Sequence, residues 1–160
     1  MDVEARLKEL GLALPEPPAA LGDYRPWVIA GPLLVLSGQL PVTGGRVLHP
    51  GRLGEISDEQ GRAAARLCAL NALAQIRSAL GDWDRLETIL RVEGHIACVP
   101  GWTGHPGVLN GASELLQEVL GPRAGHARAA FGQVSLPMNA AVELVVTAAL
   151  REEPATPPGS

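Results

Sequence analysis

Arg128 is a candidate ligand-binding residue, because it is a charged side chain flanked by small residues. Arginine is well shaped to hold a carboxylate, because its planar guanidinium can donate two parallel hydrogen bonds. The residue lies in a strand-like segment, and strand alternation places it on one face with Ala130 and Gly132. These small neighbours leave room for a ligand. A surface arginine on an edge strand would explain the same pattern.

Glu143 is the matching candidate for chemistry on such a ligand. It stands in the next strand-like segment, where Ala141, Val145 and Thr147 share its face. These neighbours predict a partly desolvated carboxylate, which is the type of group that active sites use for acid–base chemistry. The alternative is a structural glutamate that pairs with an arginine across a subunit interface.

The elements that must position these residues follow the order ββ-α-β-α-ββ. Apolar periodicities and turn residues predict strands at 27–30, 33–37, 89–99, 127–134 and 141–150, and long helices at 58–80 and 106–120. A capping box of Ser57 and Gln60 opens the first long helix, and Gly81 ends it. Residues 1–22 are expected to form an N-terminal helix and a proline-rich arm, residues 23–151 one domain, and residues 152–160 a disordered tail.

Two long helices can cover only one face of the predicted sheet. The last strand has a fully apolar face that suits these helices, made of Val142, Leu144, Val146, Ala148 and Leu150. Its other face carries Glu143 but is otherwise too apolar to be left in water, so burial against a partner subunit is expected. In the 89–99 strand, Leu90 is expected to share a face with Val92, opposite Arg91 and His95.

The composition argues against nucleic acid as a partner. The formal net charge is −4, Lys8 is the only lysine, and one Tyr and one Phe offer little for base stacking. Cys68 and Cys98 are expected to be buried, reduced thiols, and no metal-type Cys/His spacing is present. Because the sequence also lacks a signal-type apolar run and a membrane-spanning segment, we expect a cytoplasmic protein without a membrane partner.

Several segments together resemble the RidA (YjgF-type) family of imine and enamine deaminases, which is also known as endoribonuclease L-PSP-like. The resemblance covers residues 20–150 and rests on Tyr24, Leu36-Ser37-Gly38-Gln39-Leu40-Pro41, Asn110, Ala127-Arg128, Ser135-Leu136-Pro137 and Val142-Glu143-Leu144. It implies an α/β (α+β) chorismate-mutase-like fold, with a mixed β-sheet and two long helices packed on one face. It also implies a homotrimer with clefts between subunits.

The function that this resemblance implies is hydrolysis of reactive 2-imino or enamine acids to 2-keto acids and ammonia, with no metal or organic cofactor. Arg128 matches the residue that binds the substrate carboxylate in the family, and Glu143 matches the glutamate that orients the attacking water. The remaining substrate-binding residues that the resemblance implies are Tyr24, Ser37, Gly38 and Asn110.

The chain departs from the family pattern at Ala130, where many members have a cysteine. Mechanisms that use a pocket thiol are therefore closed to it. Arg25 and His95 are further positions that could change the charge of the pocket and the choice of substrate. Two other functions stay open: a non-catalytic protein that binds small carboxylates on the same scaffold, and a ribonuclease or translation inhibitor, which the charge and composition disfavour.

Overall fold

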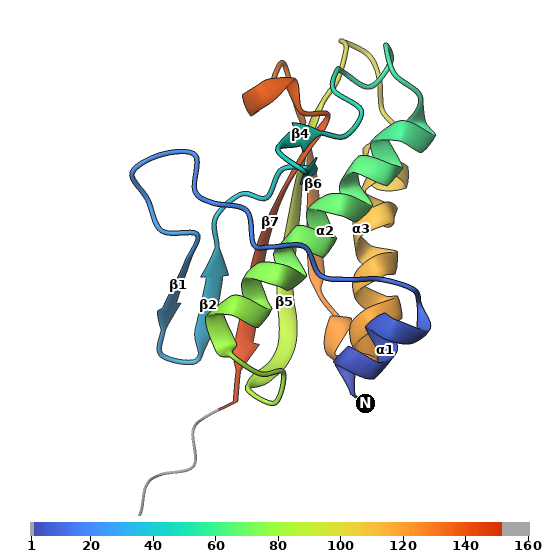
Figure 1. Cartoon of the computed structure of the whole chain (residues 1–160). Helices are drawn as coiled ribbons and strands as arrows, with labels where there is room; N and C mark the ends of the chain where they lie inside the picture. The colour runs from blue at the N-terminus through green and yellow to red at the C-terminus, as the bar shows by residue number, and fades with distance from the viewer. Residues whose placement is uncertain (1, 152–160) are drawn as a thin grey trace, which may run out of the picture.

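The computed structural model describes residues 2–151 and is built around a five-stranded sheet with the order β1-β2-β7-β5-β6 (Figure 1). β5 and β6 are parallel and the other neighbouring strands are antiparallel, so the sheet is mixed. The sheet strands are β1 (Trp27–Ala30), β2 (Leu33–Leu36), β5 (Leu86–Ala97), β6 (Ala127–Gln133) and β7 (Val142–Leu150). The helices are α1 (Val3–Glu9), α2 (Asp58–Leu80) and α3 (His105–Leu120).

Both long helices lie on one face of the sheet, as the sequence predicts (Figure 1). Alternate residues of β7 are buried beneath them: Val142, Leu144, Val146, Ala148 and Leu150. The residues between them are only half-buried, because no element of the described chain covers the other face. The predicted fold class is thereby confirmed. Among residues 2–151, no helix is both long and apolar enough to cross a membrane.

The limits of α2 follow from its sequence. The Ser57 hydroxyl accepts a hydrogen bond from the Gln60 backbone N–H at 3.2 Å, and the Gln60 side chain accepts one from the Ser57 N–H at 3.0 Å. This capping box satisfies backbone donors that would otherwise lack partners at the start of a helix. Gly81, with φ of +76°, ends the helix in a conformation that favours glycine. The predicted helix 58–80 is confirmed at both ends.

Some elements differ from the sequence prediction. β5 begins at Leu86 rather than at 89, and register shifts against β7 fall at Leu86/Thr88 and at Ile89/Arg91. Such a bulge reverses the side-chain alternation, so Ile89 is buried and Leu90 is 39% exposed. The placement of Leu90 on the face of Val92 was therefore wrong. The loop-rich stretch after β2 also contains a short hairpin, β3 (Val42–Thr43) and β4 (Arg46–Val47).

Two short 3-10 helices were also not predicted. They are η1 (Gly121–Ala124), directly after α3, and η2 (Pro137–Asn139), in the turn before β7. Both begin near a proline, whose fixed φ suits the first turn of a helix. η2 brings Met138 close to the start of β7, which carries Glu143.

α1 anchors the N-terminal segment to the helical layer. Val3 and Leu7 are buried, and the Arg6 side chain donates to the backbone carbonyl of Glu118 in α3 at 2.9 Å. Glu4 accepts hydrogen bonds from the indole of Trp83 at 2.9 Å and from Arg77 at 3.0 Å, which together lower the pKa of its carboxyl group. The predicted tail, 152–160, lies outside the described residues.

The two cysteines differ in their surroundings. Cys68 in α2 is fully buried, and burial raises the pKa of its thiol well above the ordinary value. Cys98, just after β5, is only half-buried, and its sulfur lies 3.7 Å from Nε2 of His105. Both are free thiols, as predicted. Full burial was predicted for both and holds for Cys68 alone.

The helical layer depends on close approach at Gly111 of α3. A Cβ atom there would lie 2.2 Å from the backbone carbonyl oxygen of Arg62 in α2, so one of the helices would have to shift. We expect Gly111→Ala to lower the free energy of unfolding by at least about 2 kcal/mol, as overpacking does. Gly107→Ala in the same helix meets no atom within 4 Å and is the matched control.

The control is expected to leave stability unchanged or to raise it by up to about 1 kcal/mol, because alanine favours a helix over glycine. Urea denaturation of both variants measures the two effects. Equal stability of Gly111→Ala and the wild type would contradict this account of the helix packing.

Candidate functional site

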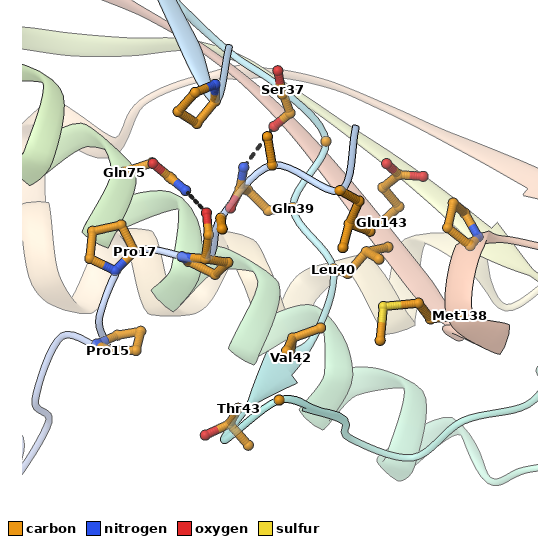
Figure 2. A pocket seen from close by; sticks show the side chains of 18 of the residues that line it. Pro15, Pro17, Ser37, Gln39, Leu40, Val42, Thr43, Gln75, Met138 and Glu143 are labelled. Carbon is orange, nitrogen blue, oxygen red and sulfur yellow. Dashed lines mark hydrogen bonds between the residues drawn. The ribbon is translucent and has the colours of Figure 1, made fainter. Parts of the chain in front are cut away.

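A cavity of about 810 Å³ opens between the N-terminal arm, the end of β2, the β3–β4 hairpin and the start of β7 (Figure 2). This size is typical of sites that bind small molecules. Four of the six predicted site residues line the cavity: Tyr24, Ser37, Gly38 and Glu143. They come from segments that are distant in the sequence, and the sheet topology brings them together.

Gly38 and Glu143 lie close together in the wall of the cavity. Just after β2, Gln39 exchanges two backbone hydrogen bonds with Leu144 of β7, at 2.8 and 2.9 Å. This pairing places Gly38 directly beside the Glu143 side chain. A Cβ atom on Gly38 would lie only 2.0 Å from Oε1 of Glu143. The absence of a side chain at position 38 therefore leaves the space that the carboxylate occupies.

The Glu143 carboxylate lies on the open face of the sheet. Its neighbour across β5 is His95, whose ring stacks on Phe131 with centroids 5.4 Å apart and lies 3.0 Å from the Gln133 amide nitrogen. Within residues 2–151, the carboxylate has no hydrogen-bond or ion-pair partner (Figure 2). It is thus an acceptor that points into a cavity with its oxygen atoms available to a water molecule or a ligand.

The two predicted hydroxyl residues have partners inside the chain. Ser37 donates to the backbone carbonyl of Arg25 at 2.7 Å, which holds the segment before β1 against the end of β2. The Tyr24 hydroxyl accepts a hydrogen bond from the Leu21 N–H at 3.1 Å, and the residue is half exposed. Both therefore shape the wall of the cavity. The hydroxyl of Tyr24 can still donate its proton to a ligand.

Arg128 and Asn110 lie together, but outside this cavity. Arg128 is on β6, at the edge of the sheet, and its register partner on β5 is the buried Val92. It therefore points to the helical face. There its guanidinium donates to Oδ1 of Asn110 at 2.7 Å and to the Ser113 hydroxyl at 3.2 Å, both on α3. Asn110 thus orients the arginine, and the guanidinium remains exposed at the sheet edge.

Within one chain, the two residues predicted to act on the ligand lie on opposite faces of the sheet. Arg128 is in the row of Val92 and Val146, whereas Glu143 is in the row of His95 and Phe131. Ala130, at the position where many family members have cysteine, pairs with Gly94 and also faces the helices. The structure therefore forms two groups from the six predicted residues, one in the cavity and one at the sheet edge.

Several cavity residues were not identified from the sequence. The N-terminal arm supplies the largest set, and the others come from the β3–β4 hairpin and from η2: Pro15, Pro17, Pro18, Leu21, Val42, Thr43 and Met138. The run of prolines was the only signal of an ordered arm, because proline-rich segments are extended. Nothing in the local sequence indicates that the arm folds back across α2 to meet the end of β2.

Comparisons with known proteins identify a family and two relatives that match most of the chain. The family described as "YjgF/chorismate mutase-like, putative endoribonuclease" matches residues 4–150. Protein TCP17 of Trypanosoma cruzi is 40% identical over 144 residues, which cover 89% of this chain and 90% of that protein. A crystal structure of "a putative endoribonuclease" from Shewanella oneidensis is 39% identical with a TM-score of 0.90, over 94% of this chain and 100% of that one.

A more distant structure carries the same fold. RidA from an Antarctic Psychrobacter is 23% identical with a TM-score of 0.61, over 84% of this chain and 94% of that chain. At this identity the likeness shows the fold alone.

The contact between Gly38 and Glu143 can be tested by a double-mutant cycle. We expect Gly38→Ala to cost about 1 kcal/mol of unfolding free energy, because the new methyl group must displace the carboxylate. A Glu143→Ala background removes the three atoms nearest to the new methyl group, so the same substitution is expected to cost almost nothing there. Chemical denaturation of the four proteins gives the coupling energy. Equal costs in both backgrounds would show that the contact does not exist.

Proposed function

The chain belongs to the YjgF/chorismate mutase-like family, and from that premise we propose that it hydrolyses reactive 2-imino or enamine acids to 2-keto acids and ammonia. The observation that carries the proposal is the Glu143 carboxylate, which points into a cavity of ligand size without a partner among residues 2–151. Tyr24, Ser37 and Gly38 line the same cavity, as the RidA resemblance implies.

The site is proposed to form between subunits. In one chain Arg128 and Glu143 lie on opposite faces of the sheet, so a ligand on Glu143 needs an arginine from a second chain. The open face offers an apolar surface for such contact, since Val28, Val35 and Phe131 are each more than 40% exposed. A homotrimer, as in the family, would place the β6 edge of one subunit beside the cavity of the next.

The reaction in this site begins with the substrate carboxylate on Arg128 of a neighbouring subunit, held by two parallel hydrogen bonds. Glu143 accepts a proton from a water molecule while the water oxygen attacks the iminium carbon. The resulting tetrahedral adduct carries a hydroxyl group and an amino group on one carbon. Glu143 returns this proton to the nitrogen, the C–N bond breaks, and ammonia leaves. Glu143 takes up the proton of the hydroxyl group as the carbonyl forms, and it then passes that proton to the departing ammonia, which is released as ammonium. One water is consumed and no redox step occurs.

The alanine at position 130 limits the choice of mechanism. It supplies no thiol, so the proposed proton transfers pass through Glu143 and water. The same substitution is the observation that favours a second function: a protein that binds small carboxylates through Arg128 without turning them over. The name endoribonuclease attached to the family fits this chain poorly, given its net charge of −4 and single lysine.

A measurement of imine turnover distinguishes the deaminase from a protein that only binds small carboxylates. We expect the protein to accelerate the loss of 2-aminoacrylate generated in situ, followed by the appearance of pyruvate. Glu143→Gln is expected to lower the rate at least about a hundredfold, because it removes the general base but keeps the shape of the side chain. Arg128→Ala is expected to lower kcat/KM by a similar factor, while Arg46→Ala, on an exposed residue outside the cavity, serves as the control.

Mixing these two variants tests whether the site lies between subunits. If Arg128→Ala and Glu143→Gln chains are unfolded and refolded together, some clefts combine an intact arginine with an intact glutamate. Random assembly then restores about a quarter of the wild-type activity, because each cleft draws its two residues from two different chains. A mixture that stays as inactive as its components would contradict the inter-subunit site. Full activity in either single variant would contradict the deaminase.

A further inference from the structure

We infer that the N-terminal arm, residues 15–21, is the wall that sets substrate specificity, and that it selects acids with an extended apolar side chain. The inference rests on the proposed function, since it takes Glu143 as the reacting end of the cavity. The arm lines the cavity along its whole length, from Pro15 to Leu21.

The cavity has two chemically different ends. Figure 2 shows Glu143 and Met138, with Leu40 beside them, at one end and Pro15 and Pro17 at the other. A substrate whose imino carbon lies at Glu143 must therefore extend its side chain toward the arm. Apart from the exposed Glu16, the arm residues that it meets are proline, alanine and Leu21, and this apolar set favours a hydrocarbon side chain.

The charges of the cavity disfavour an acidic side chain. Among the residues of the described chain that line it, the charged ones are Glu16 and Glu143, and none is a lysine or arginine. An acidic substrate side chain would be repelled and would find no cation within the cavity wall. A short side chain, such as a methyl group, would leave the apolar end filled with water and would gain nothing from it.

The arm is held in place before any ligand arrives. Gln75 of α2 is 2% exposed, and its amide donates to the backbone carbonyl of Pro18 at 2.7 Å (Figure 2). α1 anchors the arm on one side, and the Leu21 N–H bonds to the Tyr24 hydroxyl on the other. Proline fixes φ, so three prolines in the arm leave little freedom to lose on binding. The wall is thus pre-formed, as specificity requires.

Calorimetry with the full-length protein and two 2-keto acids, pyruvate and 4-methyl-2-oxopentanoate, tests the inference directly. Each buried methylene is expected to raise affinity about fourfold, so the branched acid should bind at least about tenfold more tightly than pyruvate. Pro17→Asp places a charge in the apolar end and is expected to remove this preference, with pyruvate affinity within about twofold of wild type. Ala13→Asp puts the same charge on an exposed residue just before the arm and outside the cavity, and it should leave the preference unchanged.

Gln75→Ala is a second variant that leaves the arm sequence intact. It removes the hydrogen bond to Pro18, so the preference for the branched acid is expected to shrink although no residue of the apolar surface has changed. Equal affinity of the wild type for both acids, or an unchanged preference in Pro17→Asp that melts like the wild type, would overturn the inference. If the protein prefers the branched acid but turns over no imine, the proposed deaminase activity is wrong and the inference about the arm stands. If the protein turns over 2-aminoacrylate but binds both acids equally, the deaminase activity stands and the inference about the arm is wrong.

Discussion

One constraint governs this molecule: two long helices cover only one face of a five-stranded sheet. Because side chains alternate along a strand, each strand must divide its residues between a packed face and an open one. β7 buries five aliphatic residues under the helices and leaves Glu143 on the other side. β6 points Arg128 toward α3 in the same way. The separation of these two residues within one chain is therefore a consequence of the architecture.

The separation of Arg128 from Glu143 suggests a role for the open face of the sheet as a contact surface for a second subunit. In an isolated chain, the exposed Val28, Val35 and Phe131 would stay in contact with water, and the Glu143 carboxylate would have no partner among residues 2–151. Burial of Val28, Val35 and Phe131 against another subunit would stabilise the assembly by roughly 1 kcal/mol or more for each side chain. The same contact would bring an arginine to Glu143. Assembly and completion of the site are then one event, and the proposed deaminase would exist only as an oligomer.

Much of this arrangement could be predicted from the sequence, and the reasons for the failures are physical. The capping box at Ser57, the stop at Gly81 and the alternation of β7 are local signals, and each was confirmed. The misplacement of Leu90 came from a bulge, which depends on pairing with β7 and leaves no local trace. The fold of the arm over α2 depends on Gln75, a residue that is 57 positions away from its partner Pro18. Long-range contacts of this kind are what a single sequence does not reveal.

The central claim is that a ligand is held jointly by Arg128 of one subunit and Glu143 of another. A crystal structure of the full-length protein with a bound 2-keto acid tests it most directly. The account predicts an oligomer in which the ligand carboxylate lies about 2.7–2.9 Å from the guanidinium nitrogens of Arg128, with the carbonyl carbon facing Glu143 of the adjacent subunit beside Gly38. A ligand bound by Arg128 with no Glu143 near it, or a monomer whose open sheet face lies in solvent, would contradict the claim.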